Sequence, residues 1–392
     1  MIRTTRLAFI AALIVPAALA AQQPADTTRP APPPAPAPAP TVSIPVDFSG
    51  VLYANFQYQG AKGATKSQNK FDLERAYLTF RMPAGDRASI RITADVFQQQ
   101  GTPADAYYKG WVVRAKYAYL QYDYLKGGAW TGVARAGLIH NVVIDHIEQF
   151  WPRWISQTAV ERAGFFSSAD AGVGTLITLP NKFGELYANV VNGPGYTSRE
   201  TDRFKDYAAR LTITPLSGSS NKVIKTFALS GWTYQGRLAS AFVNGGAGQV
   251  GQVGSSLPRT RSGIFVGVRD PRLSAGFDFA TRKDGVETGL NTVASPRAEI
   301  DSTRRLISGF ATIKPFQLLS DQSTFPLGLI GRWDRYKPSS GAPGYINTVI
   351  AGATWDLNKK SALSFDYQEQ TPKNGVIAAT TKTYFLHMVA NF

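Results

Sequence analysis

The chain has no cysteine and only three histidines among its 392 residues. The absence of cysteine excludes disulfide bonds, thiol catalysis and thiolate metal sites. The histidines, His140, His146 and His387, stand neither at metal-ligand spacings nor beside a nucleophile motif. We therefore expect no enzyme, and no bound metal or cofactor.

The sequence also offers no apolar run long enough for a membrane-spanning helix. Residues 7–19 form an apolar stretch of about 13 positions, whereas such a helix needs roughly 18 to 20. Two arginines precede this stretch, and Ala18 and Ala20 form a small-x-small cleavage site at its end. These features predict that residues 1–20 are a secretory signal peptide, which is removed on export.

Residues 21–46 are dominated by proline and alanine. A segment of this composition buries little apolar surface and favours the extended polyproline II conformation. It therefore predicts a semi-rigid periplasmic linker. The alternative is a ligand for a proline-binding partner.

The remaining residues, 47–392, show no composition shift that divides them, and the mean hydropathy of the chain is −0.15. A value near zero results when polar and apolar residues alternate, as they do in strands with one wet face and one lipid face. Alternating segments fall near residues 47–58, 71–82, 87–99, 112–125, 130–139, 171–180, 185–192, 206–214, 225–236, 261–269, 272–283, 304–314, 326–336, 345–357, 361–370 and 382–392. They predict an all-β fold, a transmembrane antiparallel β-barrel of about 16 strands.

The connections between these segments alternate in length. Short turns such as residues 83–86 and 181–184 alternate with long connections such as 140–170 and 237–260. Short periplasmic turns and long external loops are typical of barrels in the bacterial outer membrane, so we expect contact with outer-membrane lipid and lipopolysaccharide. A secreted β-sandwich is the alternative, but its strands usually run only about five or six residues.

The C-terminal segment carries the clearest alternation. Tyr384, Leu386, Met388 and Phe392 share one face with Ala390. A last strand of this kind, ending on phenylalanine, resembles the assembly signal of outer-membrane barrels. This resemblance implies that the barrel-assembly machinery is a partner.

The connection of residues 140–170 is long and unusually apolar. Sixteen strands leave a water-filled lumen, and a loop this apolar is expected to fold into it and narrow it. The candidate constriction residues are His140, His146, Trp151, Arg153, Trp154 and Arg162. An external loop, or a contact between subunits, is the alternative.

The mature chain resembles the phosphate-selective porin family, the porins O and P, in strand count, in the position of this third loop, and in the segment Asn192, Gly193, Pro194 and Gly195 that ends a strand. The resemblance implies a homotrimer that passes anions along an arginine-rich wall. The third loop here is not strongly basic, because its arginines face Asp145, Glu148 and Glu161.

Charge favours anions independently. Without Arg3 and Arg6, 40 basic residues remain against 27 acidic ones. The alternation of each strand places the following arginines on the inward face, as candidate pore-lining residues for anions: Arg75, Arg81, Arg87, Arg91, Arg135, Arg210 and Arg332. We therefore expect an outer-membrane porin for small hydrophilic solutes, with small anions such as phosphate preferred and without nucleic-acid binding. The alternative is a general-diffusion or sugar porin without anion selectivity.

A regular hairpin across residues 83–86 would place Arg81 opposite Arg87, and Tyr77 opposite Arg91. In that register Arg75 and Arg91 form part of an inward basic track. The chief threat to this track is Asp95, which also faces inward and is close enough in register to neutralise Arg75.

Overall fold

The computed structural model describes residues 45–60, 68–98, 110–240 and 256–392. The predicted signal peptide, and all but two residues of the predicted linker, lie outside these ranges. In the described part of the chain, no helix is long and apolar enough to cross a membrane.

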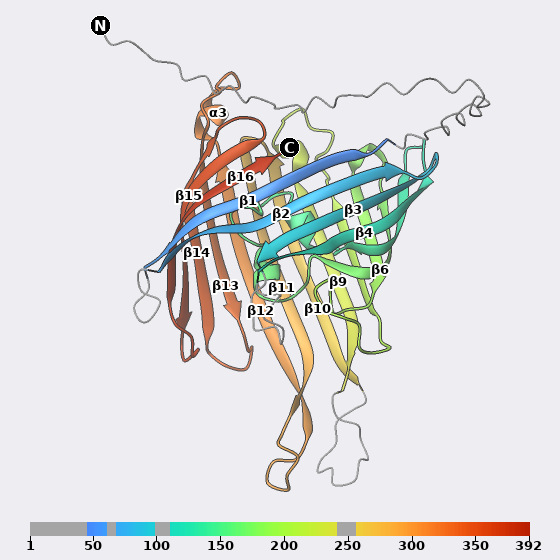
Figure 1. The fold of residues 1–392 in the computed structure, drawn as a ribbon, viewed down its shortest axis with the longest axis vertical. Helices are drawn as coiled ribbons and strands as arrows, with labels where there is room; N and C mark the ends of the chain where they lie inside the picture. The colour runs from blue at the N-terminus through green and yellow to red at the C-terminus, as the bar shows by residue number, and fades with distance from the viewer. Residues whose placement is uncertain (1–44, 61–67, 99–109, 241–255) are drawn as a thin grey trace, which may run out of the picture. The chain divides into compact units, whose positions relative to one another are not determined.

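Sixteen antiparallel strands form a closed barrel, in which each strand pairs with its sequence neighbours and β1 pairs with β16 (Figure 1). The predicted fold class is therefore confirmed. The strands are β1 (Asp47–Gln59), β2 (Asn69–Pro83), β3 (Ala88–Gln98), β4 (Trp111–Leu125), β5 (Thr131–His140), β6 (Ala169–Thr178), β7 (Gly184–Val191), β8 (Asp206–Ile213), β9 (Ala228–Ala239), β10 (Ser256–Asp270), β11 (Leu273–Thr288), β12 (Ala298–Ile313), β13 (Leu327–Lys337), β14 (Tyr345–Asp356), β15 (Ser361–Lys373) and β16 (Thr381–Asn391).

The pleat sorts side chains as the alternation predicts. On β2 and β3, Phe80 and Ile92 are exposed on the outer face, whereas Tyr77, Thr79 and Thr93 are buried inside the barrel. The hydroxyls of Thr79 and Thr93 lie 2.9 Å apart and form a hydrogen bond across the two strands. On these two strands, one face is therefore suited to lipid and the other to a polar interior.

Strands β10, β11 and β12 extend further than the alternating pattern predicts, and the hairpin of β11 and β12 projects beyond its neighbours at the end with the long connections (Figure 1). Polar side chains stand on both faces of this extension, and Lys283 pairs there with Asp301 at 2.8 Å. Alternation is lost where both faces meet water, so the sequence pattern did not indicate these ends.

The predicted register of β2 and β3 is wrong. Arg81 stands opposite Arg91 rather than Arg87, and Tyr77 stands opposite Asp95. The turn covers residues 84–87, where Gly85 adopts a φ of +112° and Ala84 N–H donates to the Ala88 carbonyl at 2.8 Å. Arg87 therefore lies in an exposed turn and not in the barrel wall.

The barrel closes where the C-terminus meets β1. Backbone hydrogen bonds of 3.0 Å run in both directions between Gly50 and Phe392. The ring of Phe392 covers Gly50 so closely that a Cβ there would lie 2.2 Å from it, which explains the glycine. Tyr384, Leu386 and Met388 are exposed on the outer face, as the C-terminal alternation predicts.

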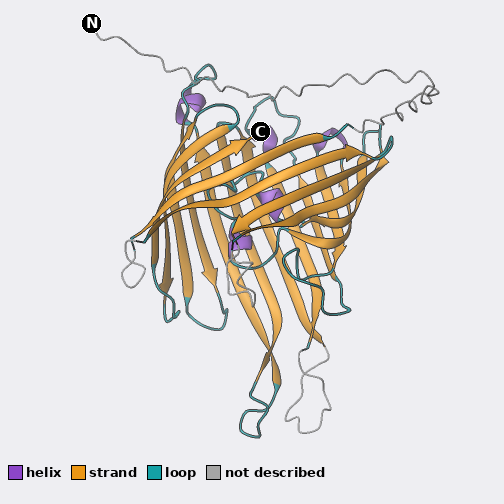
Figure 2. Ribbon diagram, in the orientation of Figure 1, coloured by secondary structure: helices purple, strands orange, loops and turns teal. Residues whose placement is uncertain are grey.

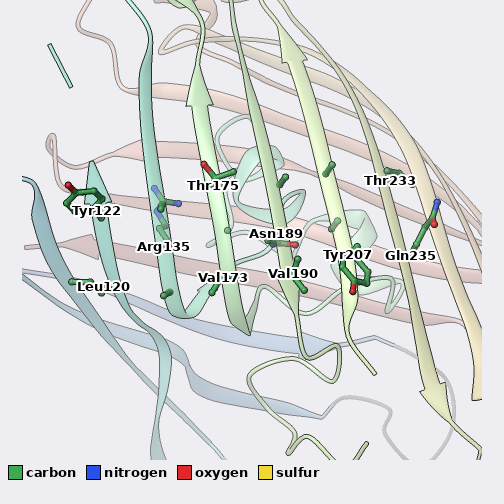
Figure 3. A pocket seen from close by; sticks show the side chains of 16 residues that line it. Leu120, Tyr122, Arg135, Val173, Thr175, Asn189, Val190, Tyr207, Thr233 and Gln235 are labelled. Carbon is green, nitrogen blue, oxygen red and sulfur yellow. The ribbon is translucent and has the colours of Figure 1, made fainter. Parts of the chain in front are cut away.

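An apolar groove of about 740 Å³ runs over the outer surface of β4 to β9 (Figure 3). Small side chains form its floor, and exposed Tyr122, Val173 and Tyr207 stand along it. This surface faces away from the lumen and suits contact with lipid or with another apolar surface.

Candidate functional site

The segment of residues 141–168, called the lumenal loop from here on, turns into the barrel after β5. It contains two short helices, α1 (Ile144–Ile147) and α2 (Ala159–Arg162), which appear among the strands in Figure 2. Ile144, Trp151, Val160 and Phe165 are at most 1 % exposed. Side chains on an external loop would remain in water, so this burial places the loop inside the barrel.

Aromatic packing holds one side of the loop against the wall. Phe150 lies 4.8 Å from Phe265 on β10, measured between ring centroids, and Trp151 lies 5.4 Å from Phe310 on β12. Phe166 lies 5.2 Å from Trp232 on β9. Full burial of such side chains contributes about 1.5–3 kcal/mol each. The loop and this wall therefore form a hydrophobic core inside the barrel.

The wall half of this core is not among the residues predicted from the sequence. Phe265, Leu306, Phe310, Ile330 and Ile350 occupy inward positions on β10 to β14, where a water-filled lumen would carry polar side chains. Apolar residues at inward positions on successive strands were the available signal. They indicate a wall that is covered from inside.

Wall side chains also hydrogen-bond the carbonyls of the loop. Arg210 Nε donates to the Val142 carbonyl at 2.6 Å, and Arg332 Nη1 donates to the Gln157 carbonyl at 2.6 Å. Tyr187 donates to the carbonyl of His140, where the loop begins, at 2.9 Å. Irregular backbone is stable in a buried position only when its polar groups have such partners.

His140 joins the start of the loop to the β3 and β4 wall. Its ring stacks on Tyr117 at 3.9 Å, its Nδ1 pairs with Asp145, and its Nε2 lies 3.1 Å from Arg91 Nη1. Arginine is always a donor, so Nε2 accepts and Nδ1 carries the proton that faces Asp145. This arrangement fixes Arg91 beside the loop.

His146 has a serine neighbour but not the arrangement of a hydrolase. Ser230 Oγ lies 2.9 Å from His146 Nε2, while Arg210 Nη1 lies 3.1 Å from Nδ1. Because arginine donates to Nδ1, the imidazole proton is on Nε2 and points at the serine, the reverse of a general base. Burial lowers the pKa of His146, and Arg210 lowers it further, so the ring is neutral. Ser230 is also only 1 % exposed.

Arg153 is the centre of a buried charge cluster. It lies 3.0 Å from Glu74 on β2, 3.5 Å from Glu148 and 3.8 Å from Glu161. Burial raises the pKa of Glu148, an effect that Lys116 and Arg153 partly oppose. Arg162 hydrogen-bonds Gln368 at 3.2 Å, and burial lowers its pKa to about 10, which leaves it charged. Trp154 lies edge-on to His387, with the ring centroids 6.4 Å apart.

The structure separates the predicted wall arginines into two groups. Arg75, Arg210 and Arg332 have carboxylate partners at 2.7–3.1 Å in Asp95, Glu185 and Asp334 respectively. Arg81 lies 3.7 Å from Asp47 in an exposed position.

Arg91 and Arg135 form no ion pair within the described residues. Arg91 contacts His140 and Thr93, and Arg135 donates to Gln121 Oε1 at 3.0 Å. Among the seven predicted arginines, Arg91 and Arg135 are therefore the two on barrel strands that have no acidic partner within the described residues.

In comparisons with known proteins, no family model matches the chain and no curated protein sequence matches it. Three similar solved structures are OmpF of Salmonella typhi in complex with daunomycin, an anion-selective porin of Comamonas acidovorans, and the trimer form of OmpT of Vibrio cholerae. Their TM-scores are 0.60, 0.60 and 0.55, with identities of 12 %, 10 % and 11 %. They cover 88 %, 89 % and 90 % of this chain, and 97 %, 100 % and 100 % of theirs. The fold is thus that of the sixteen-stranded outer-membrane porins, and these likenesses do not single out a phosphate-selective family within it.

Proposed function

We propose that the chain is a porin of the outer membrane that lets small hydrophilic solutes diffuse through its barrel, with a preference for anions. The fold supports the pore, and the lumenal loop supports a narrow one. The observation that carries the anion preference is the pair Arg91 and Arg135, which lie beside the loop without an ion pair among the described residues.

The two arginines act on the same part of the wall. The Arg135 guanidinium lies 5.4 Å from the centre of the Tyr119 ring. The Tyr119 hydroxyl and Arg91 Nη1 both lie within hydrogen-bond distance of His140 Nε2, at 3.3 and 3.1 Å. A unit charge about 6 Å away is worth roughly 3 kcal/mol to an anion at an effective dielectric constant of about 20. Salt screens this attraction over about 8 Å at physiological ionic strength.

Other charges argue for a general anion preference rather than tight phosphate binding. A specific site for phosphate usually gathers several unpaired cations around the ion. Here most lumenal arginines already have carboxylate partners. Phosphate is therefore one permeant anion among others in this proposal.

The proposal also covers the parts of the chain that the structure does not describe. Residues 1–20 serve as the export signal, and residues 21–46 link the barrel to the periplasm. The barrel inserts through the assembly machinery among lipid and lipopolysaccharide. It forms a homotrimer, as the trimer form of the Vibrio cholerae protein supports.

Replacing both Arg91 and Arg135 with glutamate should shift the reversal potential in a KCl gradient from chloride toward potassium. The reason is that two positive charges beside the loop become negative. The matched control is Arg237→Glu with Arg335→Glu, at exposed sites outside the site described above. A wild-type pore that already prefers potassium, or a double variant with unchanged selectivity, would show that the anion preference is wrong.

The sugar-porin alternative makes a different prediction for the same bilayer. Millimolar maltodextrin should leave the ion current unchanged, because Trp151 and Trp232 are buried in the core rather than lining a path. Block by maltodextrin would favour a sugar channel.

A further inference from the structure

The wall next to the lumenal loop is buried on more than one side of the barrel. On β4, Lys116 is 5 % exposed, and on β15 and β16, Asp366 and His387 are 1 % and 2 % exposed. A polar side chain that lines an open water channel keeps part of its surface in water. These side chains do not, which indicates that the loop fills the barrel at this height.

The cavities inside the barrel agree with this observation. Two of them, of about 620 and 480 Å³, lie between the loop and the end with the short turns. Both are lined by Gln149 and Phe150, so both end at the loop. Arg269 contributes to both cavities and hydrogen-bonds Gln149 between them.

The two sides of the loop are held to the wall by different forces. Toward β9 to β12 the contacts are the aromatic pairs of the core, and separating them would expose large apolar surfaces to water. Toward β2 and β4 the contacts are mainly charged and polar. We call this second contact the seam and define it by Glu74, Lys116 and Tyr117 on the wall and Asp145, Glu148, Arg153 and Glu161 on the loop.

The seam is loosely paired for a buried contact. Glu148 Oε1, Arg153 Nε and Glu161 Oε2 are buried and make no hydrogen bond with the described residues. Arg153 reaches the wall through Glu74, and Lys116 points its ammonium at the face of Tyr77, 4.2 Å from the ring centre. Buried charges lose the free energy of their hydration, and without good partners their interactions do not offset this loss. Water entering the seam would relieve this cost.

We propose that the seam is a gate: the loop closes the barrel in the conformation described here, and solutes pass when its charged side separates from β2 and β4. The core toward β9 to β12 stays packed and serves as the fixed edge of the movement. This inference rests on the proposed pore function, and it adds that the pore has a closed state and a defined line along which it opens.

Acid should favour the closed state. The groups that face Glu148 are Tyr53 on β1, Lys116 and Tyr117 on β4, and Arg153 and Glu161 on the loop. Burial raises the pKa of Glu148 in the closed seam, so the closed state binds a proton more readily than a hydrated open seam. Lowering the pH toward this raised pKa should therefore reduce the open fraction, and Glu148→Gln should weaken that dependence.

Single-channel recording of Glu74→Gln tests the gate. The substitution removes the negative charge that Arg153 reaches on the wall and leaves at most a hydrogen bond to a neutral amide. It should raise the ratio of open to closed time by at least about tenfold, because a buried cation loses its ion pair. The matched control is Asp72→Asn on the same strand. Asp72 pairs with Lys70 at 2.7 Å and is not part of the seam. This variant should behave as the wild type.

A cross-link provides the converse test, since the chain has no cysteine of its own. Glu74→Cys with Arg153→Cys, joined by a short bis-methanethiosulfonate reagent, should hold the channel closed. Each cysteine thiolate displaces a methanesulfinate to form a disulfide with the reagent, and a reductant that cleaves these disulfides should restore opening. Conduction through the cross-linked barrel, or equal open fractions in the wild type and Glu74→Gln, would overturn the gate. A barrel from which the lumenal loop has been deleted distinguishes this failure from a failure of the proposed function. If that barrel conducts, the pore function holds and only the gate is wrong. If it does not conduct, the proposed function is wrong.

Discussion

Excision of the lumenal loop is expected to raise the single-channel conductance several-fold. The change replaces residues 144–163 with a short Gly-Ser linker. It removes Trp151, Arg153 and both helices from the middle of the barrel, and a sixteen-stranded wall without them encloses a wide aqueous lumen. Planar-bilayer recording of the purified barrel measures the effect.

The excision also uncovers Phe265, Phe310 and their neighbours, so folding must be checked by heat-modifiable migration. The matched control removes residues 290–296 at the tip of the β11–β12 hairpin, where Leu290 and Val293 are exposed. That deletion should leave the conductance unchanged. If the excised barrel folds and conducts like the wild type, the loop does not limit the pore.

Deletion of Phe392 is expected to reduce assembled barrel by more than about tenfold. The residue supplies both partners of the backbone hydrogen bonds to Gly50, and its ring also contacts Phe48, with centroids 5.8 Å apart. Losing it opens the junction of β1 and β16, which a membrane tolerates poorly because unpaired backbone groups have no water there. The measurement is the heat-modifiable fraction in outer-membrane preparations.

Phe71→Ala is the matched control for this deletion. Phe71 is another aromatic side chain on the outer face, and it is 86 % exposed. It should assemble normally, because its ring packs on Phe56, with centroids 5.0 Å apart, and not on Gly50 or Phe392. Wild-type amounts of protease-resistant barrel after deletion of Phe392 would contradict the role assigned to the C-terminal residue.

Much of the barrel follows from the sequence because period-2 alternation depends on what each face touches, and lipid and water are very different solvents. The register of β2 and β3 does not follow, because it depends on the backbone of residues 84–87. The observed turn, in which Gly85 has a positive φ, and a shorter turn both keep the same side chains on the inward face. The alternation therefore cannot distinguish them. The shorter turn predicts Arg91 opposite Tyr77, whereas Arg91 stands opposite Arg81.

The candidate site was partly predictable for a similar reason. The aromatic residues of this long connection predict that the lumenal loop folds into the barrel. They do not predict which strands it packs against. Glu74 and Arg153 are 79 positions apart, and nothing in either local sequence relates them. The pairing of Arg75 with Asp95 could be predicted, because the alternation places both side chains on the inward face of neighbouring strands. That Arg91 and Arg135 have no acidic partner could not be predicted, because it depends on where every acidic side chain lies.

The interior core has a consequence for how the protein folds. Its contacts join segments that are distant in the chain, as when Gln368 on β15 donates to the carbonyl of Ile155 across 213 positions. Contacts at such separations form late, because the chain loses conformational entropy on closing the long loop before the contact can stabilise it. The loop therefore settles only after the wall has curved around it. Until then the inward apolar residues of β10 to β14 are exposed to water, so the unfinished barrel has two apolar surfaces that can associate with other chains.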